Sequence, residues 1–318
     1  MATRAPGWVP AGAWLAPGYA EWQAPAPLRS AVACLWTSVV PNEAGAAGLI
    51  LPDACSDLIW EQGAGCYVAG PDTGPARTVT KAGTVIVGVR FRPSAGGQVL
   101  GLPLSEIRDQ RVPVADLLPA AGKRLPATLD PAEAAARALD VVGRLVADAV
   151  PDPEVARAAA LLRDPATRTE DVADDVGLSV RQLRRRCHAA AGYGPKTLQR
   201  VLRFQRFVRM LDAAAPPPAD MASATRADPA GPLPGPGGPL PGPAGPLPGP
   251  AGILPGPGGP LPGPLDQAWA AALAGYADQA HLTRECAALS GLTPAALARV
   301  RGRSPRAAGA SGVLVVPR

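Results

Sequence analysis

Histidine is nearly missing from this sequence of 318 residues. Its two histidines, His188 and His281, both lie in the C-terminal half. Imidazole is a common protein ligand for zinc, copper, iron and nickel, so the N-terminal half lacks the usual ligand set of a metal-dependent enzyme. A glycine-rich phosphate loop and a Gly-x-Ser-x-Gly nucleophile elbow are also missing. We therefore expect no catalytic residues, no metal site and no cofactor.

Long apolar runs are missing as well. No stretch approaches the roughly 18 uninterrupted apolar residues of a membrane span, and proline and glycine break residues 8–22, where a signal peptide would need its apolar region. No Cys-x-x-Cys pair occurs among the five cysteines, which are Cys34, Cys55, Cys66, Cys187 and Cys286. An odd number of unpaired thiols favours a reducing compartment. We expect a cytoplasmic protein that does not enter a membrane.

Charge is distributed unevenly along the chain. The net charge is +5, yet residues 1–150 hold 12 basic and 13 acidic side chains. Residues 177–211 hold nine Lys or Arg and no acid, and residues 299–318 hold five Arg and no acid. Such basic windows are the electrostatic footprint of a polyanion partner, although a solvated basic surface would explain either window taken alone.

The N-terminal half has the pattern of short strands. Runs typical of strands, separated by Gly, Pro and Asp turn signals, occupy 31–40, 48–51, 57–60, 66–69 and 84–91. This spacing predicts a small β-sandwich or barrel, preceded by an irregular segment over residues 1–30. Helical patterns follow at about 104–118 and at 131–150, the second opening with Asp130 as N-cap and Pro131 as first helical residue. Pro151-Asp152-Pro153 then ends a domain over residues 1–150.

The C-terminal half has helical patterns with one long interruption. The expected helices cover 153–163, 170–176, 180–190, 195–211, 265–274, 279–289 and 294–299. Between them, residues 216–264 are mostly Pro, Gly, Ala and Leu, with a seven-residue repeat from Pro232 onward. Proline forbids a coiled coil, and glycine does not recur at every third position as collagen requires. We expect a disordered linker over 214–264; the alternative is a docking site for a proline-binding module. The fold class is therefore α+β.

Two segments 99 positions apart share one spacing. They read Leu183-x-Arg185-x-Cys187-x4-Gly192-x2-Pro195 and Leu282-x-Arg284-x-Cys286-x4-Gly291-x2-Pro294. Each follows a short helical pattern and a glycine turn, and each opens with a capping residue, Ser179 or Asp278. The repeated pattern predicts two helix-turn-helix units.

Each unit presents one face for packing and one for contacts with a partner. Facing inward we expect Val180, Leu183 and Cys187 in the first unit, and Leu282, Cys286 and Leu289 in the second. From the opposite face project Arg181, Arg184, Arg185 and His188. An Arg side chain can donate two hydrogen bonds to guanine O6 and N7 in the major groove. In the second unit the equivalent positions hold Ala280, Thr283 and Arg284, beside Gln279 and His281, so we expect it to supply less affinity.

At these residues the sequence resembles the AraC/XylS family. Gly177-Leu178-Ser179-Val180-Arg181 and Gly194-Pro195-Lys196-Thr197-Leu198 are similar to the first half of its DNA-binding domain. Gly275-Tyr276-Ala277-Asp278-Gln279 and Gly291-Leu292-Thr293-Pro294 are similar to the second half. The stretches 51–60, 68–71 and 88–93 resemble, more loosely, the sensor-like domain that precedes it. The resemblance implies a cupin-like barrel, then two helix-turn-helix units joined by one long helix over 195–211.

The resemblance also implies a function and its residues. We expect a first unit with the joining helix over 151–213, and a second unit with a frayed basic tail over 265–318. Together they would read successive major grooves of double-stranded DNA. The expected DNA-binding residues are Arg181, Arg184, Arg185, Lys196, Arg203, Arg206, Gln279, Ala280, His281, Thr283 and Arg284. RNA polymerase, a small-molecule effector and a second copy of the chain stay open as further partners.

This chain departs from the family pattern in the 49 residues between the joining helix and the second unit. A flexible chain of that length spans roughly 35–42 Å, which reaches the next major groove about 34 Å away. We therefore hypothesise a tethered second unit that is not docked rigidly on the first.

Two other functions are compatible with parts of the sequence. A DNA-repair alkyltransferase fused to the DNA-binding units would need an activated cysteine or a four-cysteine zinc site, and the spacing of Cys34, Cys55 and Cys66 supplies neither. A proline-rich scaffold protein would leave the repeated pattern unexplained. Asp53 and Asp57 read as turn and strand-edge residues and not as a catalytic pair.

Overall fold

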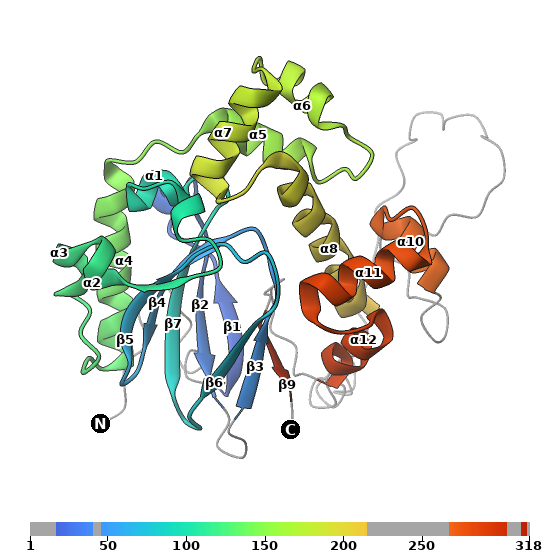
Figure 1. Cartoon of the computed structure of the whole chain (residues 1–318). Coiled ribbons are helices and arrows are strands. Elements are labelled where there is room, and N and C mark those ends of the chain that lie inside the picture. Colours follow the sequence, from blue (N-terminus) through green and yellow to red (C-terminus); the bar gives the residue numbers. More distant parts are fainter. Residues whose placement is uncertain (1–16, 41–45, 215–266, 304–312, 317–318) are drawn as a thin grey trace, which may run out of the picture.

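The structure is a computed structural model of the chain, and it describes residues 17–40, 46–214, 267–303 and 313–316. An antiparallel β domain comes first and several helices follow it (Figure 1). The fold class is α+β, as the sequence predicts. Within the described ranges no helix combines the length and the apolar character needed to cross a membrane.

Two sheets form the centre of the N-terminal domain, and the smaller one includes a strand from residues 313–316. The larger has the order β1 (Gly18–Trp22), β2 (Val32–Val39), β7 (Val85–Phe91), β4 (Ser56–Glu61), β5 (Gly65–Ala69) and β8 (Arg111–Pro113). The smaller has the order β6 (Ala76–Thr80), β3 (Ala46–Ile50) and β9 (Val313–Val316). All the paired strands are antiparallel. The five expected strands are confirmed as β2, β3, β4, β5 and β7.

The alternation of side chains along the central strands separates two environments. On β7, Val87, Val89 and Phe91 are buried in an apolar cluster that includes Ala138 and Val142 of α4 (Pro131–Ala147). Ile86 and Arg90, one residue out of step, line a cavity on the other side of the sheet. Because successive residues of a strand point to opposite faces, one strand contributes both to the core under α4 and to this cavity.

The prediction of one helix over residues 104–118 is wrong. Residues of that stretch form the 3-10 turn η2 (Leu104–Glu106), the edge strand β8 and the short helix α2 (Val114–Leu117), which α3 (Pro119–Gly122) follows. Pro113 pairs with Tyr67 of β5 at the outer edge of the sheet, where a proline is tolerated because no further strand needs its missing N–H. Four other elements were not expected from the sequence: β1, β6, the 3-10 turn η1 (Ala26–Leu28) and α1 (Gly96–Leu100).

The helices of the C-terminal half lie close to their expected positions. They are α5 (Pro153–Leu161), α6 (Thr169–Asp175), α7 (Val180–Ala191), α8 (Pro195–Ala214), α10 (Gln267–Ala274), α11 (Gln279–Ser290) and α12 (Pro294–Arg303). The expected caps are confirmed. Ser179 and Gln182 form a capping box on α7, and the Asp278 carboxylate accepts a hydrogen bond of 2.6 Å from the backbone N–H of His281.

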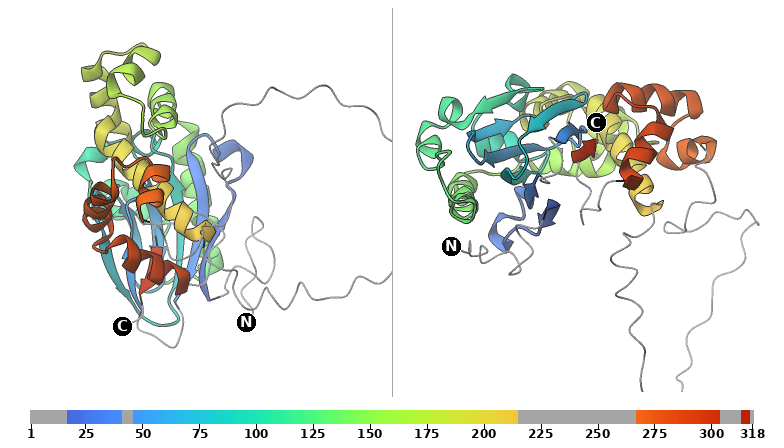
Figure 2. Two further views of the ribbon diagram at one scale, coloured as in Figure 1. Left: turned by 90° about the vertical axis from the view of Figure 1, so that its right-hand side faces the viewer. Right: turned by 90° about the horizontal axis from the view of Figure 1, so that it is seen from below.

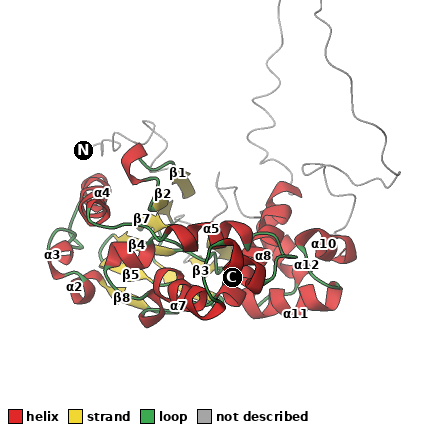
Figure 3. Ribbon diagram, turned by 90° about the horizontal axis from the view of Figure 1, so that it is seen from above, coloured by secondary structure: helices red, strands yellow, loops and turns green. Residues whose placement is uncertain are grey.

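The 20-residue helix α8 forms the centre of the helical half. Its buried residues, among them Val201, Phe204 and Val208, belong to one apolar cluster that also holds Leu183 of α7 and Leu282 of α11. Figures 1 and 3 show α10, α11 and α12 beside α8, and Figure 2 shows the sheets between these helices and α4.

The second helix group is docked on α8, so the hypothesis of an undocked second unit is wrong. Burial of Ala270, Ala274 and Leu282 in the shared cluster holds it there. Two ion pairs add to this contact: Arg200 Nε lies 2.6 Å from Glu285 Oε2, and Arg301 pairs with Asp212. Apolar burial of this kind stabilises a docked unit whatever connects it. Residues 215–266 lie outside the described residues, and so does the prediction that they are disordered.

The two halves of the chain contact each other closely. Leu49, Leu51 and Ala54 of the N-terminal half are buried in the cluster of the helical half, and Gln205 Nε2 of α8 donates a 2.6 Å hydrogen bond to the Pro52 carbonyl. The chain still passes from α4 to α5 at 148–152, where the proline-rich break was expected. The expectation of a frayed tail is wrong for residues 313–316, which pair with β3 as strand β9.

Candidate nucleic-acid interface

Helix α7 presents the arginines that the sequence singled out. Leu183 and Cys187 are fully buried, whereas Arg181, Arg184 and Arg185 are exposed. The expected inward position of Val180 is wrong, because this side chain is 43 % exposed. As the first residue of the helix, Val180 stands one turn before Leu183, where the packed face begins.

Arg186, the fourth arginine of the run, is engaged differently from its neighbours. Its Nε lies 3.0 Å from Asp152 Oδ2 and its Nη1 lies 3.2 Å from Glu154 Oε2, at the start of α5. These ion pairs fix α7 against α5 and direct the guanidinium of Arg186 toward protein carboxylates.

Helix α11 presents a more polar and less charged surface. Gln279, Ala280 and Arg284 are exposed, and His281 and Thr283 are half-buried. The Thr283 hydroxyl donates to the Gln279 carbonyl at 2.9 Å, which leaves the lone pairs of its oxygen to accept. The Gln279 amide donates to Gln267 Oε1 at 3.0 Å, a bond that a contact with a base would have to replace. Leu282, Cys286 and Leu289 are buried as expected.

The three basic candidates on α8 have different surroundings. Lys196 and Arg206 are exposed. Arg203 is half-buried, and its guanidinium lies over the Tyr276 ring, 5.6 Å from the ring centroid. Tyr276 belongs to the turn between α10 and α11. Arg203 therefore joins α8 to the second helix group through a cation–π contact, a partner that the sequence pattern did not reveal.

One cleft borders α7 and a second cleft borders α11. One, of about 490 Å³, is lined by Arg108, Arg184, His188 and Lys196. The other, of about 450 Å³, is lined by Arg168, Lys196, Arg200, Arg203 and His281. Lys196, Thr169 and Glu170 line both clefts, so the basic residues of the two helix groups belong to one continuous surface, which we call the basic surface.

Three arginines of the basic surface were missed as site residues. Arg168 and Arg200 belong to the helical half, and Arg200 stands within the basic window of the sequence. Arg108 comes from the nearly neutral N-terminal half, and only the tertiary structure places it near α7. Burial, together with Arg184 and Arg108, lowers the pKa of His188 from its ordinary 6.5, so its imidazole is neutral at pH 7 in the free protein.

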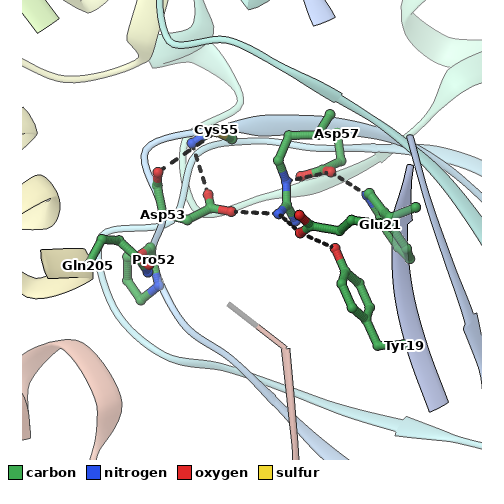
Figure 4. Close-up of polar contacts among 9 residues, drawn as sticks. Tyr19, Glu21, Pro52, Asp53, Cys55, Asp57 and Gln205 are labelled. Carbon is green, nitrogen blue, oxygen red and sulfur yellow. Dashed lines mark hydrogen bonds and ion pairs between the residues drawn. The ribbon is translucent and has the colours of Figure 1, made fainter. Parts of the chain in front are cut away.

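The N-terminal half contains a second concentration of charge. The Arg90 guanidinium lies 3.1 Å from Asp57 Oδ1, 3.2 Å from Asp53 Oδ2 and 3.5 Å from Glu21 Oε1 (Figure 4). Trp36 Nε1 donates to Asp57 at 2.7 Å. Burial raises the pKa of Asp57 to about 6. Asp53 and Asp57 thus both form ion pairs with Arg90 at the wall of a cavity. Asp57 is buried.

The described thiols lack the surroundings of a reactive cysteine. Burial raises the pKa of Cys34, Cys66 and Cys187 to about 12 and that of Cys286 to about 11, and it raises the pKa of Cys55 as well. A nucleophilic cysteine needs the opposite shift. Within the described ranges, no three or more His, Cys, Asp or Glu side chains form a group that could hold a metal ion.

Comparison with known proteins adds information on the N-terminal half. Residues 20–113, from β1 to β8, match a family model described as a domain of unknown function (DUF6597). No curated protein matches the chain, and no solved structure does. The chain therefore contains a DUF6597 domain. These comparisons match no part of the helical half, so its interpretation depends on its sequence and structure alone.

Proposed function

We propose that this protein is a sequence-specific DNA-binding transcription regulator of the AraC/XylS type. In this proposal α6–α7 and α10–α11 are helix-turn-helix units, and α7 and α11 are their recognition helices. The observation that carries the proposal is the repeated segment itself: both copies are capped helices with a buried Leu-Cys face and an exposed contact face. A DUF6597 domain, which occurs in AraC-like regulators, supports it.

The basic surface supports duplex DNA as the partner. Phosphate contacts need cations that are exposed and spread along the duplex. Lys196 stands between the two recognition helices, and Arg206 extends the exposed charge along α8. Arg181, Arg184 and Arg185 are proposed base readers on α7, and Gln279, Ala280, Thr283 and Arg284 are their counterparts on α11.

The N-terminal domain is proposed as the sensor that modulates DNA binding. Its two sheets, the smaller of which ends in β9, are compatible with the cupin-like barrel that the resemblance implies. Its contacts with the recognition units supply a route for modulation, since η2 and α1 both pack against α7.

Selection of bound sequences from random duplex DNA tests the proposal. We expect a site with two half-sites, because two docked recognition helices read two successive grooves. Inserting five or ten base pairs between the half-sites should reduce affinity steeply, because helices docked on α8 cannot follow a half-site that moves by up to about 34 Å. The Arg144→Ala variant, which removes an exposed arginine of α4, should bind as the parent does. Failure to enrich any sequence would contradict the proposal.

A further inference from the structure

A cavity of about 150 Å³ lies between the two sheets of the N-terminal domain. The larger sheet contributes Trp36, Asp57 and Ile86 to its walls, and the smaller sheet contributes Ile50 and Thr78. It occupies the face of the larger sheet opposite α4. A cavity of about this volume holds one benzene-sized ring.

The walls of this cavity carry more negative than positive charge. Four carboxylates and two guanidiniums line it, namely Asp53, Asp57, Glu61, Asp72, Arg90 and Arg111. Arg111 forms a two-point ion pair with Asp72, through Nη1 at 2.9 Å and Nη2 at 2.7 Å. Of the other three wall carboxylates, Asp53 and Asp57 pair with Arg90, whereas Glu61 accepts a hydrogen bond of 3.5 Å from the Tyr67 hydroxyl.

Arg90 is one positive charge in contact with three carboxylates. Besides Asp53 and Asp57 it contacts Glu21, and Arg90 itself is only 7 % exposed. Removing carboxylates from water is unfavourable unless each gains a cation or enough hydrogen bonds. The raised pKa of Asp57 agrees with this deficit of positive charge.

We infer that the cavity binds a small organic cation, an ammonium group joined to a compact apolar body. The ammonium group supplies the missing positive charge and donates hydrogen bonds to the Asp57 carboxylate. Glu61 lies four residues further along β4, roughly 13 Å away along the strand, and adds its negative charge to the same lining. Trp36, Ile59 and Ile86 supply the apolar walls. An anionic ligand would be repelled by the excess of carboxylates in the lining, so we expect no anion to bind.

The loops that border the cavity also contact both recognition units. A Cβ built on Gly192, the C-cap of α7, would collide with Cγ of Pro71, and one built on Gly291, the C-cap of α11, would lie 3.7 Å from Cγ of Pro75. Pro71 and Pro75 flank Asp72 of the cavity wall. The Pro52 carbonyl, next to Asp53, accepts the hydrogen bond from Gln205 of α8.

These contacts couple the cavity to the helices. A cation that binds one arrangement of the two loops more tightly shifts the protein toward it, and DNA affinity changes by the same coupling free energy. This second half of the inference rests on the proposed function, whereas the cation site does not.

Calorimetric titration of the full chain with three probes of one shape tests the site. Benzylammonium, benzyl alcohol and benzoate differ mainly in charge. We expect benzylammonium to bind at least about tenfold more tightly than benzyl alcohol, as a charged hydrogen bond provides, and benzoate not to bind. Asp57→Asn should remove most of the preference for the cation, and Glu61→Gln, which removes a more distant charge of the lining, should reduce it by a smaller amount. Asp116→Asn, at an exposed position of α2, should leave it unchanged.

Three results would overturn the inference: equal binding of the amine and the alcohol, tighter binding of benzoate, or a cation preference that survives both cavity variants. Glu61→Gln keeps the test valid if Asp57→Asn disturbs the Arg90 ion pairs. Duplex binding is measured on the same samples. If the protein binds its selected duplex but not benzylammonium, the cation site is wrong and the proposed DNA-binding function stands. If it binds benzylammonium but no duplex, the cation site stands and the proposed function is wrong.

Discussion

The two proposed recognition helices, α7 and α11, have one spacing and different chemistry. Both have a side-chain N-cap, a fully buried Leu-Cys pair and a left-handed glycine C-cap. On the contact face, α7 has Arg at three positions where α11 has Ala280, Thr283 and Arg284. Their supports also differ: both helices contact α8, but α7 packs in addition against α1 and η2 of the N-terminal domain. The shared spacing thus gives both helices the same caps and the same buried face. The exposed residues, which differ, determine how much each helix contributes to DNA affinity.

The largest expected effect tests whether the two units share one core. Leu183→Ala and Leu282→Ala each remove a fully buried side chain of the same apolar cluster, so each should lower the free energy of unfolding by about 2–5 kcal/mol. Denaturant unfolding should show one transition, shifted in both variants. A separate transition that moves only in the Leu282 variant would mean that the second unit folds independently.

The contrast in affinity can be measured at equivalent arginines. Arg185→Ala should cost roughly 1–3 kcal/mol on the selected site and relax one base position. Arg284→Ala should cost less if α7 dominates binding. Titration of both variants against the parent duplex and its single-base variants decides this. If the Arg185 variant binds every duplex as the parent does, Arg185 is not a base reader.

The two C-cap glycines are a matched pair for the contact with the N-terminal domain. Gly192 has φ +84° and Gly291 has φ +69°, so alanine at either position carries a left-handed strain of roughly 1–2 kcal/mol. Gly192→Ala should cost more, because its Cβ would also collide with Pro71. Thermal unfolding of the two variants compares these costs. Equal losses of stability in the two variants would show that the loop of residues 70–75 moves away from the new Cβ at no measurable cost.

Two arginines of α8 should behave differently although they lie three residues apart. Arg206→Ala should weaken binding to all duplexes and reduce the salt slope by about 1, as for a phosphate contact. Arg203→Ala should instead reduce stability by about 0.5–2 kcal/mol through loss of the Tyr276 contact. Binding measured against salt concentration, beside denaturant unfolding, separates them. If the Arg203 variant also shows a reduced salt slope, Arg203 contacts a DNA phosphate and its role is not only structural.

The smallest expected effect concerns pH. Arg184 and Arg108 help to lower the pKa of His188 in the free protein, and a nearby DNA phosphate would raise it again. Because the complex would then bind the proton more tightly, affinity should increase modestly as pH falls from 7 toward 5.5. His188→Gln should flatten this dependence, although Glu170 and Lys196 line the same cleft. An unchanged pH profile in the variant would place His188 away from the phosphates.

Where the sequence pattern was local, it predicted the structure well. Ser179, Asp278 and the glycines at 192 and 291 bound α7 and α11 because caps satisfy backbone groups within one turn. The strands β2, β4 and β7 follow from their apolar patterns. The pattern failed at 104–118, since an edge position in a sheet accepts a proline that would end a helix.

The candidate residues were found because an amphipathic helix exposes one face wherever it packs. Partners from distant segments could not be found in that way. The contact of Arg203 with Tyr276, the place of Arg108 beside α7 and the docking of the second unit on α8 all join segments far apart in the chain.

The sequence by itself determined the helices, their caps, the buried Leu-Cys faces and the exposed arginines, because propensity, capping and periodicity act within a few residues. Only the tertiary structure decided that α8 carries both units and that three carboxylates share Arg90 beside a cavity. It also decided that prolines of one loop lie in the space that a Cβ would enter at Gly192 and beside the space that it would enter at Gly291. Packing and electrostatic interactions depend on distance in space, and the order of residues along the chain does not specify that distance.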